Sequence, residues 1–267
     1  MKKDNSIKKI FLCIYPLFIW GIGQILTGII FQLFYIFKNV NNGTSISTQD
    51  MIGFINNNTM LILLFSSVIN IFIFMFILYK TNNLNLRINS NINKLSLLTL
   101  SAIMGISFYM LTMGIITFFD LTRYSSQYID TMEILSSGGI ILNIISVGII
   151  TPISEELMLR GLVYNNLKKY INIRSAIFIQ ALLFGILHMN IIQGTYAVLA
   201  GILIGYVYEK SNSLIVSSVF HISFNLCNHL FEVPVFSFIM GFPLGMFILG
   251  LFFFLFSIKC FNRVLVK

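Results

Sequence analysis

Eight apolar stretches dominate the sequence and restrict the chain to one class of fold. They run over residues 10–37, 60–79, 95–119, 140–166, 175–190, 195–209, 214–231 and 236–258. A helix needs about 20 apolar residues to cross the hydrocarbon core of a bilayer. With 57% hydrophobic and 10% charged residues, the 267-residue chain has more apolar surface than one water-soluble domain buries. The sequence therefore predicts an all-α, polytopic bundle of about eight transmembrane helices, with residues 1–267 forming a single integral membrane domain.

The positions of the basic residues predict how the chain lies in the membrane. The net charge is +8, and if every stretch crosses, only Lys38 and Arg123 among the basic residues between the stretches fall on one side. The basic residues on the opposite side are Lys2, Lys3, Lys8, Lys9, Lys80, Arg87, Lys94, Lys168, Lys169, Arg174, Lys210, Lys259, Arg263 and Lys267. This positive-inside pattern predicts that both termini are cytoplasmic. The basic excess is then a topology signal that also favours membrane lipids as partners, and not a sign of nucleic-acid binding.

Three of the apolar stretches contain ionisable or amide side chains. They carry PISEELMLRG at residues 152–161, LLFGILH at residues 182–188 and FHISFN at residues 220–225. Such side chains are costly in hydrocarbon, so they persist mainly where they pair with one another, face a hydrated cavity or take part in chemistry. We therefore expect a functional site within the membrane, with a motif-bearing core at about residues 148–230.

The acidic segment contains a predicted ion pair and a predicted break. Glu156 and Arg160 are four residues apart, with the acid first, which favours an ion pair on one helix face. Glu155 is turned about 100° away and is left as the unpaired carboxylate. Pro152 cannot donate to the carbonyl of Gly148, which predicts a kink or a fresh helix start. The alternative interpretation is that the group is an interfacial helix end near the cytoplasm.

The other two motifs place imidazole and carboxamide groups on two further helices. His221 and Asn225 are four residues apart and share one helix face. His229 continues this face one turn further, and we expect it to be structural. His188 on its own is as often a hydrogen-bonded packing residue as a functional one.

The predicted depths of these residues agree. Counted from the cytoplasmic ends of the stretches, Glu155 lies about 18 Å deep, His188 about 20 Å, His221 about 11 Å and Asn225 about 17 Å. Residues placed only for packing have no reason to share one layer. The agreement predicts a single site built from three helices.

Two chemistries fit these side chains. A carboxylate beside a histidine can hold a water and take its proton, while a second histidine and a carboxamide donate hydrogen bonds to an oxyanion. This combination is typical of a peptide hydrolase. Glu155, His188 and His221 also fit a zinc site of two histidines and one carboxylate with an open position for water. The sequence does not decide between metal-free water and Zn²⁺.

The motifs resemble those of a known family. PxxEExxxRG at Pro152–Gly161, FxxxH at Phe184–His188 and HxxxN at His221–Asn225 are similar to the motifs of the CAAX protease and bacteriocin-processing family of intramembrane proteases, also called the abortive-infection family. The three motifs occur in order and on separate stretches. The resemblance covers about residues 148–230, and the other stretches match only in being hydrophobic.

The resemblance implies a fold and a set of roles. The fold would be a helical bundle around a cavity open to the cytoplasm. Glu155 would activate water with His188, and His221 and Asn225 would stabilise the oxyanion. Glu156 and Arg160 would organise the site. The eukaryotic branch removes three terminal residues from prenylated proteins, whereas bacterial members, which this compact chain resembles, process peptides or act in bacteriocin immunity. A membrane-associated, hydrophobic or lipidated peptide is therefore the expected substrate.

Other functions leave different sequence signals. A non-catalytic membrane protein, acting in bacteriocin immunity, in peptide binding or as a transporter, would use the same polar cluster for binding. Transporters more often show internal repeats and paired broken helices, and here only Pro152 and Pro243 are candidate breaks. The sequence contains no HExxH and no GxGD motif, and the GxS triplet at Gly105–Ser107 is common in apolar helices.

Overall fold

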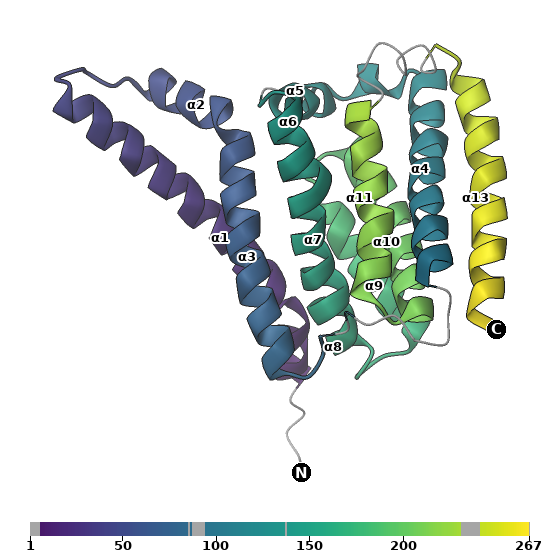
Figure 1. The fold of residues 1–267 in the computed structure, drawn as a ribbon. Coiled ribbons are helices and arrows are strands. Elements are labelled where there is room, and N and C mark those ends of the chain that lie inside the picture. The colour runs from purple at the N-terminus through teal and green to yellow at the C-terminus, as the bar shows by residue number, and fades with distance from the viewer. Residues whose placement is uncertain (1–5, 85, 87–93, 137, 231–240, 267) are drawn as a thin grey trace.

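The chain folds into a bundle of helices in the computed structural model, which describes residues 6–84, 86, 94–136, 138–230 and 241–266. The described residues contain no strand. Figure 1 shows that α1 begins and α13 ends at the same, lower edge of the bundle. The all-α polytopic fold predicted from the sequence is therefore correct.

Six helices of the described part are long and apolar enough to cross a membrane. Five of them are α1 (Ser6–Asn41), α3 (Thr59–Lys80), α4 (Lys94–Phe118), α10 (Ile191–Ser211) and α13 (Pro243–Val266). The sixth, Ile140–Leu167, is a composite helix made of α6 (Ile140–Asn143), η2 (Ile144–Ile150), α7 (Thr151–Glu156), η3 (Leu157–Tyr164) and α8 (Asn165–Leu167). Two shorter helices, α9 (Ile173–Leu187) and α11 (Leu214–Leu230), occupy the remaining predicted positions.

The fifth predicted span differs from the expectation in its length. Helix α9 has 15 residues, which rise only about 22 Å, less than the roughly 30 Å of a bilayer core. The chain then turns back into α10 through His188, Met189 and Asn190, and Met189 has a left-handed backbone with φ 57°. The Asn190 side chain caps α10 by accepting from the backbone N–H of Gln193. Helices α9 and α10 therefore form a hairpin whose turn begins at His188.

Two polar segments between the predicted apolar stretches contain helices. The stretch 39–58 holds α2 (Thr48–Asn57), which begins with a reciprocal capping box between Ser47 and Asp50. The stretch 120–139 holds η1 (Leu121–Tyr124) and α5 (Ser126–Ser136). Their composition is too polar for a span, so hydropathy alone gave no helix signal. Figure 1 shows α2 and α5 at the upper edge of the bundle.

The last predicted span is displaced along the chain. Its expected range was 236–258, whereas α13 covers Pro243–Val266. Pro243 is the first helical residue and is no break within a span, because proline is well accommodated where the helix has no N–H partner to lose. Predicted features at residues 236–240, and at Lys2, Lys3, Arg87 and Lys267, lie outside the described residues.

Several glycines permit close helix contacts, and two of them lie on helices that carry or flank the polar motifs. A Cβ atom on Gly105 of α4 would lie 3.1 Å from the backbone nitrogen of Phe224 on α11. It would lie closer still to the carbonyl oxygen of Phe220 on the same helix. A Cβ atom on Gly201 of α10 would lie 2.9 Å from Cα and Cβ of Ala181 on α9. Small residues at such crossings let helix backbones approach in a membrane, where apolar side chains gain little from contacting protein instead of lipid.

This packing explains the GxS triplet. Gly105 is the contact point between α4 and α11. The hydroxyl of Ser107 donates to the carbonyl of Ile103 in its own helix, 2.6 Å away, and Ser107 is buried. Serine hydroxyls commonly make such bonds inside apolar helices. The triplet is therefore part of the helix packing.

Substituting Gly105 by alanine should destabilise the bundle. The new methyl group would press on the α11 backbone, which cannot rotate away as a side chain can, so we expect a loss of about 1–3 kcal/mol. Gly21→Ala is the matched control, because a Cβ atom at Gly21 of α1 meets nothing within 4 Å. Thermal unfolding in detergent should show a lower Tm for Gly105→Ala only. Equal Tm values for the two variants would contradict this packing.

Candidate active site

The acidic motif lies on a composite helix with two wide-turn segments. The π-helical segments η2 and η3 flank α7, which carries Pro152, Glu155 and Glu156. The expected fresh helix start at Pro152 takes the form of a register change within a continuous helix: the π register of η2 ends at Ile150, and the α register of α7 begins at Thr151 with Pro152 in its first turn. Such π segments occur often at functional sites, because they move neighbouring side chains out of the regular helical positions.

Because of the register change, the carbonyl of Val147 accepts a hydrogen bond from a side chain of another helix. The backbone N–H of Thr151 donates to Ser146 O, five residues back. In this register the next N–H would belong to Pro152 and would reach Val147 O, not Gly148 O as the sequence suggested, but proline has no N–H. The Asn225 side-chain amide of α11 donates to Val147 O instead, with Nδ2 and O 3.0 Å apart. Pro152 and Asn225 are thus linked through Val147 O: the proline cannot donate to this carbonyl, and the asparagine does.

The predicted ion pair between Glu156 and Arg160 is present. Arg160 Nη1 lies 2.7 Å from Glu156 Oε1, and both side chains are fully buried. His221 Nδ1 lies 3.0 Å from the same carboxylate oxygen. Arg160 Nη2 also donates to the Gly201 carbonyl at 3.1 Å. The pair therefore joins the composite helix to both α10 and α11, with its charges compensated inside the bundle.

Glu155 faces His221. Its Oε2 lies 3.6 Å from His221 Nε2, and the residue is 9% exposed. The expectation of a carboxylate without a partner is therefore corrected. The distance is longer than a hydrogen bond, and the two groups form an ion pair when the His221 ring carries both protons. His221 lies between two carboxylates, with Nδ1 toward Glu156 and Nε2 toward Glu155.

His188 is held at the end of α9 in a defined tautomer. Its Nδ1 lies 2.9 Å from the Phe184 carbonyl oxygen. A carbonyl only accepts, so Nδ1 carries the proton, and in a neutral ring Nε2 is left with a lone pair. The Phe184 ring contacts both histidines edge to face, with centroids 4.8 Å from His188 and 5.4 Å from His221. Arg160 lies over the same ring, at 5.5 Å.

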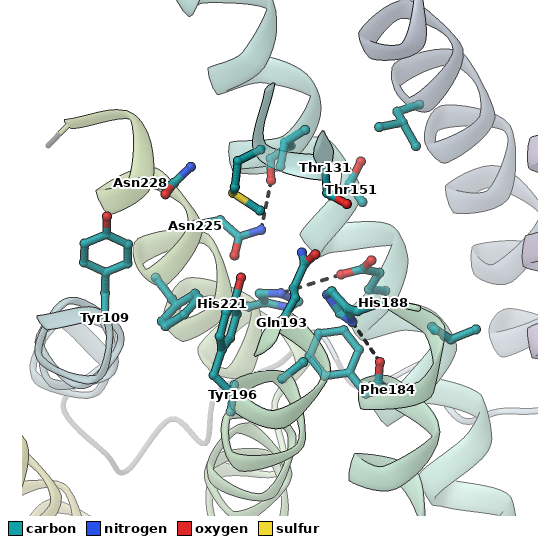
Figure 2. Close-up of a pocket in the computed structure, with 18 of the residues that line it drawn as sticks. Tyr109, Thr131, Thr151, Phe184, His188, Gln193, Tyr196, His221, Asn225 and Asn228 are labelled. Carbon is teal, nitrogen blue, oxygen red and sulfur yellow. Dashed lines mark hydrogen bonds and ion pairs between the residues drawn. The ribbon is translucent and has the colours of Figure 1, made fainter. Parts of the chain in front are cut away.

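A cavity of about 260 Å³ brings the predicted residues together. Glu155, His188, His221 and Asn225 all line its wall, and Figure 2 shows the last three around one space. Glu156 and Arg160 do not line it. The motif residues of three separate stretches therefore face one cavity, and the ion pair supports it from behind.

Several lining residues were not predicted from the sequence. They come from all around the bundle and include Trp20, Gln24, Tyr109, Thr131, Gln193, Tyr196 and Asn228. These are neutral polar or aromatic residues, which are ordinary in a transmembrane helix and give no signal before the helices are placed. His229, which we expected to be structural, also lines the cavity. Thr131 comes from α5, the helix that hydropathy missed.

The zinc alternative has one observation on each side. Within the described ranges, no three His, Cys, Asp or Glu side chains are grouped as metal ligands. His188 Nδ1 is engaged by the Phe184 carbonyl, and His221 Nδ1 by Glu156. Metal-ligating histidines commonly have one ring nitrogen engaged in this way and bind the metal through the other, so both Nε2 atoms are of the kind that a zinc ion would use.

Comparison with known proteins gives one match. The family model described as type II CAAX prenyl endopeptidase Rce1-like matches residues 137–227. This match confirms the resemblance that the three motifs indicated. Neither a curated protein nor a solved structure matches the chain.

Removing Arg160 should unfold the site. Arg160→Met leaves the fully buried Glu156 without its cation, and breaking a buried pair from one side costs about 3–5 kcal/mol. Lys168→Met is the matched control, because its partner Glu209 is 3.3 Å away in a partly exposed bridge worth about 0–1 kcal/mol. Tm in detergent should fall strongly only for Arg160→Met and recover in part when Glu156→Gln is added. A double variant no more stable than Arg160→Met would contradict the charge argument.

Proposed function

On the premise that residues 137–227 carry the sequence of the CAAX protease family, we propose that the chain is an intramembrane peptidase. One observation supports this best: Glu155, His188, His221 and Asn225, from three separate parts of the chain, line one cavity inside the bundle. Ionisable groups are expensive at such depth. Their convergence on a cavity is what hydrolysis needs, since water and substrate must meet there.

Glu155 is the proposed general base. Its carboxylate takes a proton from a water molecule while the water oxygen attacks the carbonyl carbon of the peptide bond. The acceptor nitrogen Nε2 of neutral His188 orients the same water. The proton then passes from Glu155 to the nitrogen of the leaving amine as the C–N bond breaks. The products are a carboxylic acid and an amine, so no further reactant is required.

Asn225 and His221 are the proposed oxyanion partners. One N–H of the Asn225 amide is used by Val147 O, and a carboxamide has a second N–H to offer. His221 Nε2 can donate only when the ring carries both protons, because Nδ1 already donates to Glu156. In a site that excludes water, hydrogen-bond donors directed at the developing negative charge usually make the largest single contribution to the rate enhancement of acyl transfer.

Glu156 and Arg160 are the proposed organising pair. They contact His221 and the Gly201 carbonyl, and they do not line the cavity. Their role is to fix the His221 ring relative to Glu155, in the way that buried partners orient catalytic imidazoles.

The proposed substrate is a membrane-associated, hydrophobic or lipidated peptide. The cavity wall includes apolar side chains such as Leu63, Met113, Leu187 and Phe224. Its volume of about 260 Å³ is at the small end for ligand pockets, so it holds a short extended segment and not a folded domain. Membrane lipids are the surrounding partner, and no nucleic acid is involved.

We propose that the lower edge of the bundle in Figure 1 is cytoplasmic, together with both termini. At this edge α3 ends with Lys80, Lys168 directly follows α8, and Lys210 lies in the last turn of α10. The helices that contain Lys38 and Arg123, at the end of α1 and in η1, reach the other edge. The positive-inside rule favours the basic edge as cytoplasmic.

Glu155→Gln should abolish peptide cleavage. The amide has the same shape but cannot take a proton from water, so kcat should fall by about 100-fold to 10,000-fold. Asp130→Asn, on the exposed face of α5, is the matched control and should retain full activity. The measurement is cleavage of a quenched hydrophobic peptide library by the purified protein in lipid, with and without a metal chelator.

The outcomes separate the alternatives. Cleavage that is lost in Glu155→Gln and kept under chelator supports direct water activation, while loss under chelator would support the zinc alternative, with Glu155, His188 and His221 as the ligands. A Glu155→Gln variant that remains fully functional in the producing cell would refute the peptidase and favour a binding or immunity role.

A further inference from the structure

Gln193 is a cavity residue that none of the three motifs includes. It lies in the first turn of α10, five residues after His188, and lines the cavity that contains Glu155 and His221. We propose that Gln193 is a catalytic oxyanion donor and that Asn190 is its positioning residue. The inference rests on the proposed peptidase function and assigns a residue role within it.

The orientation of the Asn190 amide is fixed by its neighbours. The backbone N–H of Gln193 points at the Asn190 side chain, 2.7 Å from Oδ1. A backbone N–H only donates, so the atom that it meets must be the oxygen. The other atom of the Asn190 amide is therefore Nδ2, and it is a donor.

The orientation of the Gln193 amide follows from that of Asn190. Asn190 Nδ2 lies 2.8 Å from the Gln193 side chain. Because Nδ2 donates, the atom of Gln193 that it meets must be Oε1. The oxygen of Gln193 is thus turned toward Asn190, and the two N–H groups of Nε2 remain for the cavity. Figure 2 shows Gln193 among the labelled residues around the cavity, together with His188, His221 and Asn225.

The oxyanion needs a further hydrogen-bond donor because the Nδ1–H group of His221 is already bonded to Glu156. Its Nδ1–H donates to Glu156 at 3.0 Å, so a neutral His221 presents only a lone pair at Nε2. An oxyanion facing that nitrogen would be repelled. Gln193 Nε2 donates in every protonation state of the ring, and so does the second N–H of Asn225. Gln193 of α10 and Asn225 of α11 thus supply donors that do not depend on the protonation of His221, which donates only when its ring carries both protons.

The donor acts at one step. As water attacks the carbonyl carbon, the C=O electron pair moves onto oxygen, and the Gln193 N–H donates to that oxygen. When the C–N bond breaks, the pair returns to form the carboxylic acid, and the hydrogen bond weakens. Gln193 neither gains nor loses a proton, so its contribution appears in the transition state.

The test compares kcat and KM for Gln193→Met and Asn190→Asp with those of wild type. Methionine keeps length and removes both N–H groups, so kcat should fall by about 100-fold or more with KM nearly unchanged. An Asp at 190 still accepts from the Gln193 backbone, but it can no longer donate to Oε1. The Gln193 amide should then rotate and turn its oxygen to the cavity, and kcat should fall although every lining residue is retained. Gln127→Met on the exposed face of α5 is the control.

A second readout is inhibitor binding. A peptide phosphinate carries a tetrahedral anion, so its affinity should fall in Gln193→Met while the affinity for the intact peptide, measured in a Glu155→Gln background, stays within a few-fold. Equal losses of both affinities, or an unchanged kcat with a wild-type Tm, would overturn the oxyanion role. Failure of the proposed function is distinguishable, because wild type and Glu155→Gln would then show equal rates, and the inference would fall with it.

Discussion

The buried cluster of Glu156, Arg160 and His221 is the interaction on which the site depends. Glu156 Oε1 accepts hydrogen bonds from both Arg160 Nη1, 2.7 Å away, and His221 Nδ1, 3.0 Å away. Neither charge is stable alone at this depth, so the three side chains hold their helices in one arrangement. This arrangement sets the His221 tautomer and turns its second nitrogen toward Glu155. The positions of the proposed base and of the oxyanion donors follow from it.

The backbone also takes part in building the site. Proline within a π-helical register leaves Val147 O without its own donor, and Asn225 supplies one from a neighbouring helix. A free carbonyl is tolerated at membrane depth only where protein or a cavity satisfies it. Likewise, the turn at Met189 lies between His188 and Asn190, and both are hydrogen-bonded to nearby residues. These two irregularities thus accompany the polar side chains of Asn225 and His188 in the cavity wall.

Most of the fold could be predicted because a long apolar stretch in a membrane forms a transmembrane helix. The helices α1, α3, α4 and α10 lie where hydropathy placed them. The predictions were less accurate where hydropathy carries no information. The polar helices α2 and α5 were missed, and α9 is too short to cross. The start of α13 was displaced because an apolar stretch does not mark where its first helical residue lies.

The sequence by itself determined the membrane class, the ion pair between Glu156 and Arg160, and the set Glu155, His188, His221 and Asn225, because charge in an apolar stretch and four-residue spacing are local signals. Only the tertiary structure decided which groups meet. It placed His221 between two carboxylates, brought the Asn225 amide within hydrogen-bonding distance of Val147 O, and placed Gln193 in the cavity wall. These contacts join residues far apart in the chain, and their hydrogen-bond directions depend on neighbours that no spacing rule specifies.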